Sequence, residues 1–181
     1  MTFLSASMPC SATALVLAAA FSVLGVAHAQ QAPQAPAEAP AVRIERNMSL
    51  RLANDIAAGT VAACAANGYA VTATVVDRAG VVRAVQRADN AGSHTVGAAE
   101  RKAWTSASAK APTQAMMENA QKNPGAANLV HIPGFLLLGG GVPVKVGNEV
   151  IGAVGVGGAP GGHLDEQCAN AGIERVKAQL N

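Results

Sequence analysis

Residues 131–162, HIPGFLLLGGGVPVKVGNEVIGAVGVGGAPGG, combine short apolar runs with many glycines. Apolar runs bounded by turn residues predict strands, which here fall at 134–138, 142–146 and 149–156. Gly147-Asn148 is a hairpin turn signal between the last two runs. Glycines at strand ends permit close packing by neighbouring backbone, so this stretch predicts part of an antiparallel sheet.

The flanking sequence supplies one more hairpin and several helices. Their expected bounds are a helix over 49–67, two strands joined by a turn at 77–80, helices over 93–111 and 113–122, and a last helix over 165–180. Hairpins with helices grouped between them favour an antiparallel sheet flanked by helices. The sequence therefore predicts an α+β domain with a five-stranded antiparallel sheet.

Composition limits the choice of partner. The chain has 181 residues, 13 Lys+Arg and 11 Asp+Glu, a net charge of +2 and a hydrophobic fraction of 50%. No run of Lys or Arg and few aromatic residues are present, so no footprint for nucleic acid is found. We expect one compact domain over 42–181.

The N-terminal region resembles a targeting segment. Residues 11–27 are apolar and are followed by Ala27-His28-Ala29, a small-residue cleavage pattern. We predict a signal peptide over 1–29, a Pro/Ala-rich spacer over 30–41, and a periplasmic or secreted protein without a stable membrane anchor after cleavage. The alternative is an uncleaved anchor.

Two cysteines, Cys64 and Cys168, lie in the predicted domain. An even pair in an exported protein is consistent with one disulfide. Two buried free thiols are the alternative, because Cys is often buried.

Common catalytic motifs are missing from the sequence. Gly155 and Gly157 do not begin a dinucleotide fingerprint, because position 160 is Pro. The sequence contains no phosphate-binding loop motif, H-E-x-x-H, C-x-x-C or G-x-S-x-G. These absences remove the usual support for nucleotide-binding proteins, zinc hydrolases, thioredoxin-like proteins and serine hydrolases.

The remaining candidates are few. Outside the signal segment the histidines are His94, His131 and His163, and each has a solvated loop position as its ordinary interpretation. Arg87 and Asp89 follow a predicted strand, where a surface ion pair is the ordinary interpretation. By their charge, Lys102 and Lys110 are expected on a solvated helix face. Met116 and Met117 lie on a short predicted helix, where core packing is expected of at least one and contact with a flat apolar ligand is the alternative.

Five motifs occur together in one order: V-D-x-x-G, R-x-D-x-A, K-A-x-T, G-G-G-x-P and G-x-x-G-V-x-G-A followed by an acidic residue. In this combination the chain, from about Ser49 to Leu180, resembles the GlcG/HbpS family, which includes haem-binding proteins and the C-terminal domain of PduO-type proteins. The family pattern has V-S-G-A where this chain has Val156-Gly157-Gly158-Ala159.

The resemblance implies a five-stranded sheet with profilin-like layering, a homo-oligomer, and binding of haem or a related tetrapyrrole. The positions that match its motifs are Arg87, Asp89, Ala91, Lys102, Ala103, Thr105, Thr113, Gly139, Gly140, Gly141 and Pro143. We expect residues 139–143 near the ligand, because missing side chains let a flat molecule approach.

The chemistry of the residues agrees in part with haem. By residue type His94, His131, Met116 and Met117 are eligible axial ligands. No C-x-x-C-H is present, so covalent attachment is excluded. Arg87, or else Lys102, is expected to pair with the propionates. The sequence thus favours an exported haem-binding or haem-sequestering protein, with three alternatives: a haem-degrading enzyme, an accessory subunit of an oxidoreductase, and a module that only keeps the fold.

Overall fold

The structure, a computed structural model, describes residues 39–181. The chain divides into two units, Met1–Val42 and Arg43–Asn181, and the second contains every described helix and strand. The predicted signal peptide and most of the predicted spacer lie outside the described residues. The elements are α1 (Leu50–Ala66), β1 (Thr72–Asp77), β2 (Val82–Arg87), α2 (His94–Ala109), α3 (Thr113–Lys122), the 3-10 helix η1 (Ala127–His131), β3 (Gly141–Val146), β4 (Glu149–Gly157), α4 (Gly162–Arg175) and the 3-10 helix η2 (Lys177–Gln179).

Helix α1 begins and ends where its capping residues indicate. The Ser49 side chain accepts a hydrogen bond from the amide of Leu52, which satisfies one of the free N–H groups of the first turn. Asn67 caps the other end, and Gly68 follows with φ +79°, a conformation that glycine adopts without steric cost. The predicted helix over 49–67 therefore agrees with the structure.

The sheet is antiparallel, with strand order β2-β1-β4-β3. It has four strands, so the prediction of five was wrong. The two predicted hairpins are present: β1 pairs with β2, and β3 pairs with β4 across the Gly147-Asn148 turn. All six residues of β1 are buried, because the strand lies inside the sheet with helices on both faces.

The missing strand is the apolar run 134–138. Its backbone groups bond to side chains of α2 and α3 instead of a neighbouring strand: the amide of Leu136 donates to Thr105 Oγ1 (2.9 Å), and the carbonyl of Leu138 accepts from Thr113 Oγ1 (2.7 Å). Gly134, at φ +88°, turns the chain as it enters the run. These local partners satisfy the backbone without a ladder.

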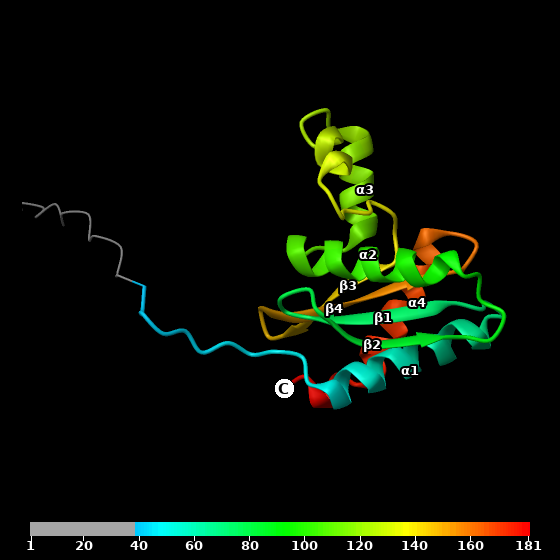
Figure 1. The fold of residues 1–181 in the computed structure, drawn as a ribbon, viewed down its shortest axis with the longest axis horizontal. Coiled ribbons are helices and arrows are strands. Elements are labelled where there is room, and N and C mark those ends of the chain that lie inside the picture. The colour runs from blue at the N-terminus through cyan, green and yellow to red at the C-terminus, as the bar shows by residue number, and fades with distance from the viewer. Residues whose placement is uncertain (1–38) are drawn as a thin grey trace, which may run out of the picture. The chain divides into compact units, whose positions relative to one another are not determined.

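Helices cover both faces of the sheet (Figure 1). Helix α2 packs on one face against β1, β3 and β4, while α1 and α4 pack on the other. The main core lies between the sheet and the pair α1 and α4, where Ile56, Val75 and Val154 are fully buried. Helix α3 extends away from the sheet beyond α2, with η1 beside it, and only Thr113 of α3 is buried.

A disulfide joins α1 to α4 through Cys64 and Cys168, whose Cα atoms lie 5.3 Å apart.

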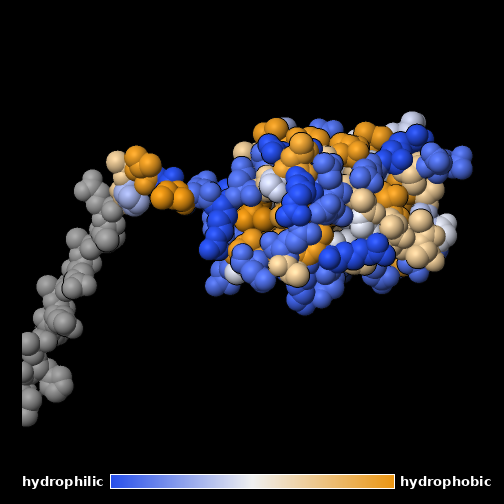
Figure 2. Space-filling model, turned by 90° about the horizontal axis from the view of Figure 1, so that it is seen from below, coloured by the Kyte–Doolittle hydropathy of each residue, from blue (hydrophilic) through white to orange (hydrophobic). Residues whose placement is uncertain are grey.

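The last helix begins at Gly162, earlier than the predicted Asp165, and the regular helix ends at Arg175. On the side of the molecule where α1 lies, hydrophilic and hydrophobic residues are interspersed on the surface (Figure 2). Within residues 39–181, no helix has the length and apolar character needed to cross a membrane.

Candidate functional site

A pocket of about 260 Å³ lies where the start of α2 meets the loop that leads into α4. We call it the glycine-loop pocket. Its lining residues are His94, Thr95, Ala98, Lys102, Leu138, residues 157–162 and Asp165. Four of the six loop residues are glycines. A Cβ on Gly158 would lie 2.6 Å from the carbonyl oxygen of Ala70 and one on Gly162 would lie 2.8 Å from the amide nitrogen of Gly139, so these glycines let the loop pack closely against the rest of the protein. The pocket therefore combines a closely packed glycine loop with one imidazole and one buried ion pair.

The buried ion pair joins α2 to α4. Lys102 Nζ donates to Asp165 Oδ2 (2.8 Å) and to the carbonyl of Val156 (2.8 Å), and both side chains are almost fully buried. Asp165 Oδ1 in turn accepts from the amide of Ala159 (2.9 Å). The predicted solvated position of Lys102 was therefore wrong. Because its charge is already matched by Asp165, Lys102 is a poor partner for a ligand carboxylate.

Burial affects the protonation of two neighbouring acids on α4. Desolvation raises the pKa of Asp165, while the hydrogen bond and charge of Lys102 and the amide of Ala159 oppose the rise. Desolvation also raises the pKa of Glu166; backbone hydrogen bonds from Gln114 and Gly140 oppose the rise, and the charge of Glu118 adds to it. One carboxyl oxygen of Glu166 is buried and has no hydrogen-bond partner within the described residues.

His94 is the first residue of α2 and is exposed at the pocket rim. Its ring lies over Gly92, where an added Cβ would come within 2.7 Å of the ring. The next residue, Thr95, fixes this end of the helix, because its hydroxyl donates to the carbonyl of Gly92 (2.6 Å) and lies 2.7 Å from the hydroxyl of Thr72 on β1. Thr95 thus holds the start of α2, and with it His94, at one end of the sheet.

Arg87 lies at that same end of the sheet. It pairs with Thr72 in register, and Thr72 pairs with Gly157 at the edge of the glycine-loop pocket. Two strand spacings, about 10 Å, therefore separate Arg87 from the pocket wall. Its guanidinium donates to the carbonyl of Ala91 and is otherwise exposed. Asp89 is also exposed, and the two side chains form no ion pair within residues 39–181.

The two predicted threonines are used inside the protein. Thr105 and Thr113 are buried, and their hydroxyls bind the backbone of 136–138, as described above. Thr113 Oγ1 also accepts from the amide of Gly141 (2.8 Å). Both residues therefore hold the chain between η1 and β3 against α2 and α3.

The predicted approach of a flat molecule to residues 139–143 does not fit the structure. A Cβ on Gly140 would meet Val156 O and Asp165 Cβ at 2.7 Å, and one on Gly141 would meet Lys102 O at 2.4 Å. These glycines are buried and let β3 lie against α2 and α4. Pro143 is also buried, opposite Ala153 in β4. The space that we expected to be free for a ligand is filled by the protein itself.

The histidines and methionines are divided among different elements. His131, in η1, is exposed and does not line the glycine-loop pocket. Met116 and Met117 are half-buried on α3 and do not line it either. His163 is exposed on α4, with its ring over Gly161 of the loop. Of the predicted iron ligands, the pocket therefore contains only His94.

The pocket fits one edge of haem by the chemistry of its residues. An exposed imidazole is an eligible ligand of haem iron, while Ala98, Leu138 and Pro160 offer apolar contacts beside the polar backbone of the loop. The volume is slightly below the range typical of sites that enclose a ligand. The residues present therefore fit a macrocycle that is partly covered by this chain. Residues 39–181 contain no group of three or more His, Cys, Asp or Glu side chains suited to a metal ion.

Sequence reasoning missed Asp165 and the pocket role of loop 157–162. The acidic residue after the last glycine motif was noted, but its spacing does not show that it reaches Lys102, 63 positions earlier. The available sequence signal was a single lysine inside an alanine-rich helix together with the two acids after the glycine loop, Asp165 and Glu166.

The model of a family described as "haem degrading protein HbpS-like" matches residues 48–174. No curated protein sequence matches the chain.

This chain aligns with solved structures of the same fold over nearly the whole length of those structures. A double mutant of HbpS from Streptomyces reticuli is 35% identical, with a TM-score of 0.70 over 81% of this chain and 98% of that one. The protein ORFY of Klebsiella pneumoniae is 27% identical, with a TM-score of 0.73 over 78% and 98% of the two chains. A structure described as a PduOC:haem complex is 21% identical, with a TM-score of 0.63 over 71% and 94%, which shows a shared fold.

Proposed function

Because the chain belongs to the HbpS-like family, we propose that it binds haem reversibly through the glycine-loop pocket, with His94 as the axial ligand. The observation that carries this proposal is an exposed imidazole at the rim of a pocket whose lining includes Ala98, Leu138 and Pro160. His94 is favoured over His131 because His131 lies outside the pocket. The chain has no C-x-x-C-H motif, so the binding is non-covalent. Bound haem supplies a redox-active iron centre.

Arg87 is the proposed partner of the propionates. It lies at the same end of the sheet as His94, and its guanidinium is exposed, unlike the buried ammonium of Lys102. A guanidinium binds a carboxylate through two parallel hydrogen bonds. Its bond to the carbonyl of Ala91 orients the side chain while other N–H groups stay available.

The proposal also includes export of the protein and its assembly into an oligomer. The apolar segment with a small-residue cleavage pattern supports export, and the bond between Cys64 and Cys168 suits an oxidising compartment. We propose a periplasmic or secreted homo-oligomer. The exposed apolar residues in and after η1, namely Val130, Ile132 and Leu138, are the proposed contacts of this assembly.

The family description favours one second function, haem degradation. The test is incubation of the haem-loaded protein with a reductant or with peroxide. Degradation predicts loss of the Soret band faster than free haem loses it under the same conditions. Sequestration predicts that the protein slows this loss.

Haem titration of His94→Ala and His131→Ala tests the proposed ligand. We expect the wild type and His131→Ala to give the same saturable Soret shift. His94→Ala is expected to lose the shift or bind at least tenfold more weakly, because it removes the iron ligand. His131→Ala is a matched control, since both imidazoles are exposed and lie in helical segments.

A pair of arginine variants tests the propionate contact. Arg87→Gln is expected to weaken haem binding about tenfold, the effect of losing one charge-assisted hydrogen bond of roughly 1.5 kcal/mol. Arg83→Gln, on the same strand and also exposed, is expected to leave the affinity unchanged.

For the histidine variants, equal titration curves for His94→Ala and the wild type would exclude His94 as the ligand.

A further inference from the structure

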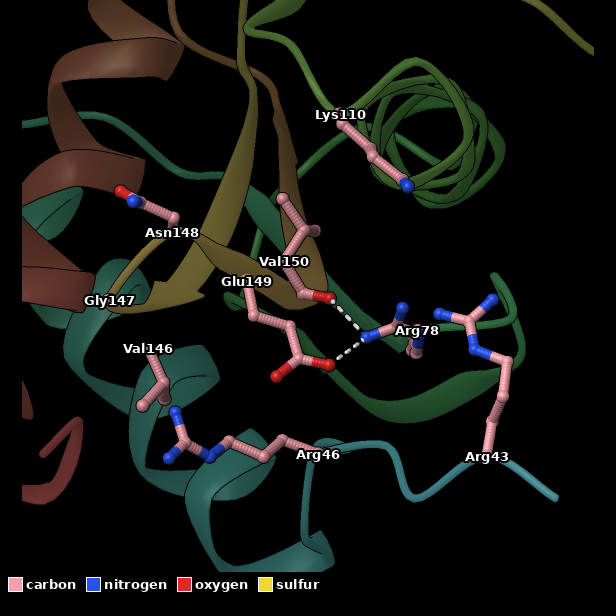
Figure 3. Close-up of a pocket in the computed structure, with 9 residues that line it drawn as sticks. All are labelled: Arg43, Arg46, Arg78, Lys110, Val146, Gly147, Asn148, Glu149 and Val150. Carbon is pink, nitrogen blue, oxygen red and sulfur yellow. Dashed lines mark hydrogen bonds and ion pairs between the residues drawn. The ribbon is translucent and has the colours of Figure 1, made fainter. Parts of the chain in front are cut away.

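A second and larger pocket, of about 490 Å³, lies at the opposite end of α2, beside the β3–β4 turn. We call it the cationic pocket. Four cations line it: Arg43, Arg46, Arg78 and Lys110. Its other lining residues are Val146, Gly147, Asn148, Glu149 and Val150. Figure 3 shows Arg78 beside Glu149, Arg46 on another side of it, and Arg43 and Lys110 farther out.

The cations come from three separate parts of the chain. Arg43 and Arg46 precede α1, Arg78 lies in the turn between β1 and β2, and Lys110 follows α2. Bringing like charges together is unfavourable unless anions are present between them. Convergence of cations from distant sequence positions on one concave surface therefore points to a negatively charged ligand.

Arg78 is already held in position. Its guanidinium binds Glu149 Oε1 (2.5 Å) and Glu45 Oε2 (3.1 Å), and only 22% of its side chain is exposed. Arg43 also pairs with Glu45 (3.2 Å). Two carboxylates thus neutralise part of the cluster and fix the side chain at its centre.

Arg46 and Lys110 supply the unmatched charge. Both are exposed, and within residues 39–181 neither forms an ion pair or a side-chain hydrogen bond. The four cations outnumber the two nearby carboxylates, so the pocket carries a positive excess. A bound anion could bring these two side chains together without breaking the pairs of Arg78.

The backbone at Lys110 is a second, independent observation. Lys110 ends α2 in the left-handed conformation, at φ 55° and ψ 30°, a position where glycine or asparagine is usual. The chain accepts this conformation with a lysine, whose side chain extends toward the pocket in Figure 3. Strained non-glycine residues of this kind occur often at ligand-binding positions.

We propose that the cationic pocket binds a small, multiply charged anion that carries phosphate or carboxylate groups. Its volume lies in the range of small-molecule sites, and guanidinium groups match both kinds of anion bidentately. The pocket is separate from the proposed haem site, because its lining contains no His, Met, Tyr or Cys to bind iron.

Calorimetric titration with pyrophosphate and with citrate tests the proposal and separates its two chemistries. The wild type is expected to bind at least one of them saturably, with an affinity that falls as salt concentration rises. Acetate, with one charge, is expected to bind at least tenfold more weakly. The absence of saturable binding of both polyanions at low salt would overturn the proposal.

Charge variants test the position of the site. The double variant Arg46→Gln/Lys110→Gln is expected to weaken binding at least tenfold. Its matched control, Arg51→Gln/Lys122→Gln, removes two exposed cations outside the pocket and is expected to bind like the wild type. Equal losses in the two double variants would show attraction by net charge alone and overturn the site.

For two further variants we expect effects that a loss of folding would not produce. Glu149→Gln is expected to strengthen anion binding, because it removes a negative charge from the pocket and frees Arg78. Glu174→Gln, an exposed carboxylate of α4, is its control. Lys110→Gly is expected to weaken binding while it raises the melting temperature, because glycine relieves the left-handed backbone. Unchanged binding in both Glu149→Gln and Lys110→Gly would contradict the proposal, whatever the outcome for haem.

Discussion

At the scale of single residues, the ion pair between Lys102 and Asp165 determines how the glycine-loop pocket is built. It connects α2, the end of β4 and the start of α4 through three short hydrogen bonds. A charged side chain in a helix ordinarily indicates a solvated position, and the partner is 63 residues away. Neither the burial of Lys102 nor its partner could therefore be predicted from spacing.

Replacing one member of this pair is expected to cost more than replacing both. Lys102→Met and Asp165→Asn should each lower the free energy of unfolding by about 3–5 kcal/mol, because each leaves an unpaired buried group. The double variant should lose less than the sum, since no buried charge remains without a partner. Urea denaturation of the four proteins measures the coupling.

The exposed pair of Lys122 and Glu118, 4.0 Å apart, provides the control cycle. Its coupling is expected to stay below about 1 kcal/mol, as for solvated ion pairs. Strict additivity of the losses at Lys102 and Asp165 would show that the buried pair does not act as a unit.

At the scale of elements, the segment 134–141 is the part of the fold that the sequence pattern did not predict correctly. The helices and the two hairpins follow from periodicity and turn residues, which are local signals. The run 134–138 has the apolar composition of a strand, yet Thr105 and Thr113 supply its hydrogen-bond partners. Because these contacts join distant parts of the chain, the number of strands could not be predicted from the run itself.

Thr113→Val is expected to loosen this segment. The carbonyl of Leu138 and the amide of Gly141 would each lose a partner, at a cost of about 1–3 kcal/mol. Hydrogen exchange at the amide of Gly141 should become faster, while Thr113→Ser, which keeps the hydroxyl, should exchange like the wild type. Equal exchange in Thr113→Val and the wild type would contradict the role that we assign to this hydroxyl.

At the scale of the whole molecule, one disulfide closes a large part of the domain. Cys64 and Cys168 are 104 positions apart and tie the two helices that cover one face of the sheet. Cross-links that close long loops restrict the unfolded chain most, with effects of about 2–5 kcal/mol. The double variant Cys64→Ala/Cys168→Ala is expected to unfold at a lower urea concentration by that amount.

Reduction separates this effect from the loss of two buried side chains. A thiol reductant should lower the unfolding midpoint of the wild type toward that of the double variant and leave the double variant unchanged. An unchanged midpoint of the reduced wild type would mean that the bond does not contribute to stability.

The family was also predicted correctly at this scale, because its five motifs occur together in one order. Three of them lie at the ends of elements, while residues 102–105 lie inside α2 and residues 152–159 begin inside β4. The position of the pocket was not predicted from the sequence, because it depends on the contact between loop 157–162 and the start of α2. The motif positions 139–141 turned out to pack the sheet against its helices.

The most direct test of haem binding is an equilibrium titration of the purified wild type, followed by the Soret band and by the fluorescence of Trp104. Trp104 is the single tryptophan and lies on α2, the helix that begins with His94. We predict a saturable Soret shift with parallel quenching of Trp104 at a fixed ratio of haem to chain. A spectrum that stays that of free haem at every ratio would contradict the proposed function.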